Sequence, residues 1–488
     1  MSSLSPKPAP TPSPAGMSGP GGDAGDAPPR FPVFIAVVVA IAFLMEQLDS
    51  TIVTTALPDM AHALHTSAVD MNLAVSAYVL TLAVFIPLSG WFADRFGARR
   101  IFMSALALFT LGSVLCGAAQ DFSMLVATRV LQGLGGAMMT PVGRLILLRS
   151  FPRRQLVRAM TYTTLPAIVG PVLGPLVGGY LTTYLSWRWI FYVNVPFGLL
   201  GMLLAWYLVD PRPAEPDSRF DLGGFVLFGT GVALLQLLME GFGLLRPLLL
   251  AASAAGAVLL LLAFARRNRD RARPAVDLSL LRERAFGLAT LAGGLCRVAM
   301  NAPVYLLPVM LQVGLGMSAV ESGSLTFLSA AGAPVVRLVI GPALRRWGFR
   351  RLLMGSALAC AAVLSSFVGI GTLTPHWLIA VAIVAYGAVR STQFMSSNTL
   401  AYADVAAERL SRATSLGGLL QQLTVSFGVA LGAAALRVLS HGAAPRLAQF
   451  HAAFLVLALL PLLAIPAFAR LRLQDGAQVS GHRPRPRP

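Results

Sequence analysis

The most regular feature of this chain is a series of long apolar runs, each close to 20 residues, separated by short polar connections. A helix rises about 1.5 Å per residue, so about 20 apolar residues cross the hydrocarbon core of a bilayer. Each run is therefore predicted to be a transmembrane helix. The fourteen predicted spans are residues 33–57, 70–92, 100–119, 123–148, 158–181, 188–209, 222–241, 246–265, 285–311, 319–342, 351–371, 377–399, 412–436 and 450–469.

The composition also indicates a membrane protein. Apolar residues make up 56% of the 488 residues and charged residues only 12%, whereas soluble proteins carry about 25% charged residues. The formal net charge of +18 could suggest nucleic-acid binding, but the arginines lie mostly between the apolar runs, where membrane topology explains them. Cys116, Cys296 and Cys360 lie inside apolar runs without a pairing pattern, so no disulfide, zinc or haem site is predicted. We expect no cofactor and no metal.

The distribution of arginine predicts the orientation in the membrane. Connections that follow even-numbered runs, such as 149–158 and 266–273, carry most of the Lys and Arg residues. Positively charged connections stay in the cytoplasm, so both termini are predicted to be cytoplasmic, which requires an even number of spans. The Pro-, Gly- and Ser-rich residues 1–30 are expected to be a disordered cytoplasmic tail rather than a cleavable signal, and 471–488 a basic cytoplasmic tail.

An internal repeat predicts two related halves. The stretch GWFADRFGARR (Gly90–Arg100) recurs 251 residues later as GPALRRWGFRR (Gly341–Arg351), and the same offset places SAVD (67–70) on SAVE (318–321). We therefore expect an N-terminal six-helix half at 31–210, two inserted helices with a cytoplasmic linker at 211–284, and a C-terminal six-helix half at 285–470. Repeated membrane halves with a substrate site between them are typical of alternating-access transporters.

Several stretches place polar or glycine-rich patterns inside or beside the apolar runs: LDSTIVTTALP (48–58), RVLQGLGGAMMTPVGR (129–144), VGPVLGPLVGG (169–179) and WRWIFYVNVPFG (187–198). Together with GWFADRFGARR, these motifs resemble those of the major facilitator superfamily, and specifically its fourteen-span drug:proton antiporter branch of the EmrB/QacA type. The resemblance covers about residues 31–470. It implies an all-α membrane fold of two six-helix halves plus two inserted helices, and export driven by inward proton flow.

The resemblance also assigns roles to residues at matching positions. It places Asp94, Arg95 and Arg99 in a network that gates the cytoplasmic side, and Arg129 in proton coupling. For Arg129 the alternative is a structural arginine that anchors neighbouring carbonyl groups. In the 169–179 stretch glycine allows close helix approach, so tight packing and a moving hinge are both open. Its gating candidates are Gly170, Pro171, Gly174 and Pro175.

Two acidic residues in the first run are the leading candidates for proton handling. Glu46 lies near the middle of 33–57, and Asp49 shares its helix face about 4.5 Å further along. An ionised carboxylate facing lipid costs a few kcal/mol, so this face is expected to point into the bundle. Asp49 is either a proton-coupling group or a structural carboxylate bonded to backbone or to hydroxyls such as that of Thr51. Glu46 is expected to load a proton from outside and release it inside, and it can also contact substrate.

Charged residues near mid-membrane predict a substrate site. Arg297, which the 251-residue offset places on Glu46, and Arg390 lie about 18–20 Å into their runs. With Glu46 and Asn301 they are the candidate substrate-binding residues, and a helix-tying role is the alternative for each arginine. Because protonating Glu46 leaves the arginines in excess, we hypothesise a preference for anionic, zwitterionic or neutral solutes over permanent cations.

The remaining charges are predicted to be structural. Asp221 is expected to cap the helix at 222–241, and Glu240 and Glu321 are expected at outer ends within reach of water. His62 and His65 are expected on a solvated loop rather than in a metal site.

These features predict a proton-coupled secondary active transporter that exports small organic compounds (multidrug efflux), a multi-pass protein of the cell (inner) plasma membrane. The alternatives are a dedicated metabolite or amino-acid exporter of the same fold and a non-transporting membrane sensor. An enzyme is not expected, because the short connections carry no paired metal ligands, nucleophile elbow or phosphate-binding loop. The expected partners are a small-molecule substrate, protons and the lipid bilayer, without nucleic acid. A periplasmic adaptor protein is left open, and a monomer is expected.

Overall fold

A computed structural model describes residues 32–150, 169–170, 173–210, 221–242, 246–269, 278–406, 409–441, 443–472 and 474–476, and these are mostly helical. A first group of helices comprises α1 (Pro32–Ala63), α2 (Asn72–Phe96), α3 (Ala98–Gly117), α4 (Phe122–Ser150), α6 (Trp189–Tyr192) and α7 (Asn194–Leu208). The inserted pair is α8 (Leu222–Gly241) and α9 (Pro247–Arg269). A second group comprises α10 (Arg284–Asn301), α11 (Pro303–Val309), α12 (Ala319–Phe327), α13 (Gly332–Ser366), α14 (His376–Ala403), α15 (Leu410–Ser440) and α16 (Leu447–Ala469). Short helical turns are η2 (Leu278–Arg282), η3 (Met310–Gly314), η4 (Leu328–Ala331) and η5 (Phe367–Gly369).

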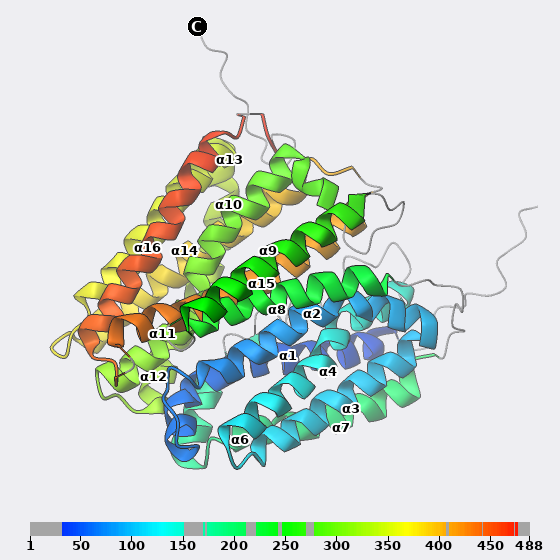
Figure 1. The fold of residues 1–488 in the computed structure, drawn as a ribbon, viewed down its shortest axis with the longest axis horizontal. Coiled ribbons are helices and arrows are strands. Elements are labelled where there is room, and N and C mark those ends of the chain that lie inside the picture. Colours follow the sequence, from blue (N-terminus) through cyan, green and yellow to red (C-terminus); the bar gives the residue numbers. More distant parts are fainter. Residues whose placement is uncertain are drawn as a thin grey trace, which may run out of the picture.

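The inserted pair lies against the seam between the two groups. In Figure 1 the blue and cyan helices of the first group lie on one side, and the yellow to red helices of the second group lie mostly on the other. Helix α2 of the first group packs against α15 of the second, and α8 contacts both of them as well as α9. The insertion therefore touches both groups.

The internal repeat reappears in the backbone. Gly97, between α2 and α3, has a φ of 89°, and Gly348, inside the stretch that forms α13, has a φ of 68°. These two glycines are 251 residues apart, the offset of the repeated loop sequence. Positive φ is readily adopted only by glycine, so both copies of the loop turn the chain by the same device.

Twelve helical segments among the described residues are long and apolar enough to cross a membrane. The expected span at 158–181 lies largely outside the described residues, although 173–184 are helical. The expected span at 319–342 is interrupted: α12 ends at Phe327, η4 follows, and the chain continues into α13. Gly348 then separates this segment from the span expected at 351–371. The all-α, fourteen-span architecture agrees with this arrangement.

The apolar core differs between the two ends of the molecule, which we call the α1–α2 end and the α2–α3 end after the connections found there. At the α1–α2 end one cluster includes Met60 and Ile190 of the first group together with Tyr305 and Phe450 of the second. At the α2–α3 end most core residues of the two groups fall into separate clusters. The groups are therefore joined mainly at the α1–α2 end.

Candidate functional site

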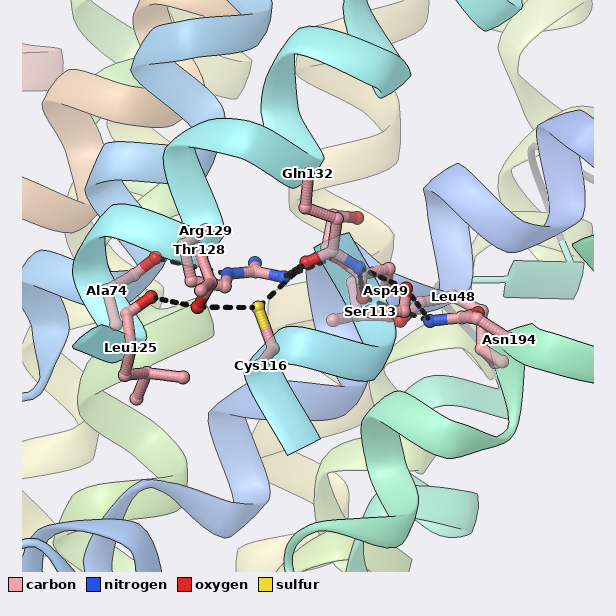
Figure 2. A network of polar contacts seen from close by, with 12 residues as sticks. Leu48, Asp49, Ala74, Ser113, Cys116, Leu125, Thr128, Arg129, Gln132 and Asn194 are labelled. Carbon is pink, nitrogen blue, oxygen red and sulfur yellow. Dashed lines mark hydrogen bonds and ion pairs between the residues drawn. The ribbon is translucent and has the colours of Figure 1, made fainter. Parts of the chain in front are cut away.

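A buried polar network joins α1, α3, α4 and α7 (Figure 2). At its centre lies Asp49 of α1, which is fully buried. Its Oδ2 accepts a hydrogen bond from Arg129 Nη1 at 2.6 Å. Its Oδ1 accepts from Gln132 Nε2 at 2.8 Å and from Asn194 Nδ2 at 3.1 Å. The carboxylate is thus held by three donors from α4 and α7.

Arg129 of α4 supplies the positive charge of this network and is 1% exposed. Its Nη1 also donates to Gln132 Oε1 at 2.6 Å, and its Nε donates to the carbonyl of Ala74 in α2 at 3.2 Å. The guanidinium carbon lies 4.1 Å from the ring centroid of Tyr78, a cation–π distance. Arg129 therefore anchors a neighbouring carbonyl, as the structural alternative expected, and also pairs with an intramembrane carboxylate, while its role in proton coupling stays a prediction.

Sequence reasoning missed the polar side chains that surround the Asp49–Arg129 pair. Gln132 donates to Ser113 Oγ of α3 at 2.7 Å, and Asn194 links α7 to Asp49. The motif stretches 129–144 and 187–198 each contain one amide side chain, and these are Gln132 and Asn194. A lone amide in an apolar stretch is the signal that could have found them, because a buried polar group needs a partner. Ser113 carried no comparable signal.

The suggested hydroxyl partner of Asp49 was wrong. The hydroxyl of Thr51 donates to the carbonyls of Gln47 and Leu48 in its own helix, at 3.1 and 3.2 Å. Residues two apart point to different sides of a helix, so Thr51 does not face the same way as Asp49. The partners of Asp49 instead come from other helices.

Glu46 lies on the same side of α1 as Asp49 but in a different environment. Its Oε2 accepts a short hydrogen bond from the hydroxyl of Thr140 in α4. The side chain is half-buried, and no cation among the described residues lies within ion-pair distance of it. A hydroxyl can donate to a carboxylate or accept from a carboxylic acid, so Thr140 can bond Glu46 in either protonation state.

The glycines of the 169–179 stretch face α1 at close range. A Cβ added to Gly170 would lie 2.5 Å from Gln47 Cβ, and one added to Gly174 would lie 2.1 Å from Thr51 Oγ1. These glycines are four residues apart and share a helix face, so their lack of side chains permits the close approach. Further along, the carbonyl oxygen of Pro175 would lie 2.3 Å from a Cβ on Gly323 of α12. Pro171 lies outside the described residues.

The loop residues implicated in gating lie at the α2–α3 end. Asp94 and Arg95 belong to the last turn of α2, and Arg99 to the first turn of α3. Arg99 Nη2 donates to the carbonyl of Trp206 in α7 at 2.5 Å, and its guanidinium lies 4.9 Å from the Trp206 ring centroid. Arg99 thus ties the loop to its own group of helices, and the gating role stays a prediction.

The structure brings together two of the candidate substrate residues of the second group. Arg390 Nη2 of α14 donates to Asn301 Oδ1 of α10 at 3.0 Å. Arg297 makes a different contact: it is 8% exposed, and its Nη2 donates to the carbonyl of Thr290 in its own helix at 3.2 Å. Arg297 therefore does not contact Glu46, its partner by the sequence offset.

The expectation that Glu240 lies within reach of water was wrong, because the side chain is only 6% exposed. Its carboxylate accepts from Asn72 Nδ2 of α2 at 3.1 Å and from Gln236 Nε2 at 3.3 Å. The physical reason is the position of α8, which packs into the seam between α2 and α15. Glu321, by contrast, is exposed and forms a capping box with Ser318. Asp221 caps α8 as predicted, accepting from the Gly224 amide at 3.1 Å.

Polar contacts between described residues also join the two groups at the α1–α2 end. Gln312 Nε2 donates to the carbonyl of Thr55 at 3.0 Å, and the hydroxyl of Tyr305 donates to the carbonyl of Ala68 at 3.2 Å. Arg437 of α15, 5% exposed, pairs with Asp70 at 3.1 Å and donates to the carbonyl of Glu240 at 2.7 Å. Arg437 therefore connects the first group, the inserted pair and the second group.

Within the described part of the chain, no cluster of three or more His, Cys, Asp or Glu residues could hold a metal ion. His62 lies in the last turn of α1, and His65 lies in the connection that follows and has a φ of 53°.

Comparison with known proteins gives the family. The sequence profile of the Major Facilitator Superfamily matches residues 39–429 and 289–488. A protein of Cronobacter sakazakii is 39% identical over 444 residues, 90% of this chain and 94% of the relative. A protein of Pectobacterium atrosepticum is 38% identical, over 88% of this chain and 93% of the relative. Both carry the name multidrug resistance protein MdtD, as a provisional assignment.

Solved structures agree on the fold. A D-xylose-proton symporter aligns with a TM-score of 0.65 at 15% identity, covering 91% of this chain and 99% of the symporter. The POT family transporter PepTSo aligns with a TM-score of 0.67 at 15% identity, covering 93% of this chain and 99% of the transporter. The motif resemblance is confirmed, and the chain belongs to the Major Facilitator Superfamily of multi-pass membrane transporters.

Proposed function

We propose that this chain is a proton-coupled antiporter that exports small organic compounds by alternating access. One observation carries the proposal: two carboxyl groups on one side of α1 have opposite environments within a transporter fold. Asp49 is fully buried and paired with Arg129, whereas Glu46 is half-buried and bonded to a hydroxyl. The name of the relatives, multidrug resistance protein, supports drugs as the exported compounds.

In this proposal Glu46 carries the proton, and the Asp49–Arg129 pair holds α1 in the position that Glu46 requires. The buried pair and its amide donors fix α1 against α4, so Glu46 stays opposite Thr140. The hydroxyl of Thr140 can follow a change of protonation by reversing its hydrogen bond. Arg129 contributes to coupling because any movement of α1 relative to α4 has to displace a buried charge pair.

The asymmetry of the two ends supports alternating access. The six-helix halves 31–210 and 285–470, with the insertion 211–284 between them, are proposed to rock against each other. With both termini in the cytoplasm, the α1–α2 end faces outside, so the structure corresponds to a state closed to the outside. Opening outward has to break the Gln312–Thr55 and Arg437–Asp70 contacts. Asp94, Arg95 and Arg99, with Gly170, Pro171, Gly174 and Pro175, remain the proposed gating residues.

The proposed transport function also implies the binding partners and the location of the protein. We propose a monomer in the cytoplasmic (inner) membrane whose partners are substrate, protons and lipid, and which catalyses no chemical reaction.

Transport by purified protein in proteoliposomes tests the function. A chemically varied panel of compounds is presented while a pH gradient is imposed and then collapsed with an ionophore. We expect gradient-driven accumulation of some compounds, and counterflow of the same compounds without a gradient. Counterflow that ignores the gradient contradicts proton coupling, and absence of both signals across the panel contradicts transport.

A further inference from the structure

The mid-membrane charges are distributed unequally between the two groups of helices. In the first group the charge of Asp49 is neutralised by Arg129 at 2.6 Å. In the second group Arg297 and Arg390 have no carboxylate within ion-pair distance among the described residues. The acids of the second group lie at helix ends, as with Glu321 at the start of α12 and Asp404 after α14. The interior of the second group is therefore positively charged.

Arg390 is the more exposed of these two arginines. It lies near the middle of α14, about 21 Å from the first residue of the helix. Its side chain is half-buried, and two neutral side chains contact it: Asn301 accepts from Nη2 at 3.0 Å, and Tyr386 lies beside it. A guanidinium has five N–H donors in a planar fork, and the bond to Asn301 uses one of them.

Arg297 does not offer the same chemistry. Its side chain is 8% exposed, and its guanidinium turns back to the Thr290 carbonyl of its own helix. The substrate hypothesis drawn from the sequence used both arginines, whereas the structure favours Arg390 alone.

We propose that Arg390, oriented by Asn301, binds a carboxylate group of the exported substrate, so that the substrate is an organic anion or zwitterion. The inference rests on the proposed function only in that the bound compound is exported, since binding itself can be measured without transport. A guanidinium fork matches a carboxylate with two parallel charge-assisted hydrogen bonds. A quaternary ammonium offers no donor or acceptor to this fork and is repelled by its charge. Glu46 belongs to the first group, so proton and carboxylate occupy different groups of helices.

Three probes with one ring system test the proposal: naphthoate, naphthamide and trimethyl(naphthylmethyl)ammonium. Their binding to purified protein is measured by equilibrium dialysis, and their movement in proteoliposomes is measured under an imposed pH gradient. We expect naphthoate to bind at least about tenfold more tightly than the ammonium compound, as one charge-assisted hydrogen bond implies. Arg390→Gln should remove this preference. The matched control Arg266→Gln changes an exposed arginine of α9 and should keep it.

Arg390→Lys is a second variant that distinguishes loss of the binding group from a folding defect in the Gln variant. It keeps the positive charge but loses the planar fork, so it should bind naphthoate less tightly without gaining affinity for the ammonium compound. The proposal is overturned if naphthoate does not bind, if the ammonium compound binds as tightly, or if the preference survives in both Arg390 variants.

The two proposals fail in different ways. Arg390-dependent binding of naphthoate without gradient-driven movement of any probe supports the carboxylate site and contradicts the antiporter. Gradient-driven movement of naphthamide or the ammonium compound, with no binding of naphthoate, supports the antiporter and overturns the carboxylate site.

Discussion

Replacing Asp49 by Asn exchanges one carboxylate oxygen for an NH2 group and should break the network around Arg129. The oxygens of Asp49 face a guanidinium on one side and the amides of Gln132 and Asn194 on the other, and all three groups donate. The introduced amide can satisfy only one side, because its own N–H donors oppose the other. Since Arg129 is 1% exposed, Asp49→Asn leaves a buried charge unpaired, and we expect the free energy of unfolding to fall by about 3–5 kcal/mol.

A double-mutant cycle measures this coupling directly. Asp49→Asn, Arg129→Met and the double variant are unfolded with a denaturing detergent while tryptophan fluorescence is followed. The double variant removes both charges, so it should cost about 2–3 kcal/mol less than the sum of the single variants. Glu321→Gln, at an exposed helix start, is the matched control. Additivity of the two single variants, or a loss below about 1 kcal/mol for Asp49→Asn, would refute the buried-pair reasoning.

Three further predictions address helix packing, the contacts at the α1–α2 end and the membrane topology. Gly178→Ala should lower the free energy of unfolding by about 1–3 kcal/mol, because the new Cβ would lie 2.4 Å from the Ile52 carbonyl oxygen. Gly355 has open space around it, so Gly355→Ala should be near neutral in the same unfolding assay. Arg437→Gln should loosen the α1–α2 end, because it removes the ion pair with Asp70. A cysteine placed at residue 55 should then react faster with a membrane-impermeant thiol reagent than it does in the parent. An unchanged rate would count against closure of the α1–α2 end by this ion pair. A cysteine at residue 270 should resist that reagent in intact cells, and labelling there would reverse the proposed orientation.

The helices were predictable because their cause is local. A run of about 20 apolar residues must satisfy its backbone hydrogen bonds within the membrane, and a helix does so within the segment itself. The interruption at 328–331 was not predictable from that rule. There Gly332 packs against the backbone of Ala388 in α14, where an added Cβ would lie 2.3 Å from its nitrogen. This contact is between helices and leaves no periodic signal in the sequence.

The candidate site was predictable in its charges and not in its pairings. Intramembrane Glu46, Asp49 and Arg129 stand out in sequence because charge in hydrocarbon is costly. That Asp49 pairs with Arg129, 80 residues away, depends on how α1 and α4 pack. The burial of Glu240 likewise depends on where the inserted pair lies, and a position near the end of an apolar run gave the opposite expectation.

Substrate-driven proton movement in Glu46→Gln proteoliposomes tests whether Glu46 carries the coupled proton. A pH-sensitive dye inside the vesicles reports proton flux while substrate counterflow is measured in the same preparation. The Gln side chain keeps an acceptor for Thr140 but cannot release a proton, so proton flux should disappear while counterflow persists. The control Glu321→Gln should retain both signals. Full substrate-driven proton flux through the Glu46→Gln variant would show that Glu46 is not the proton carrier.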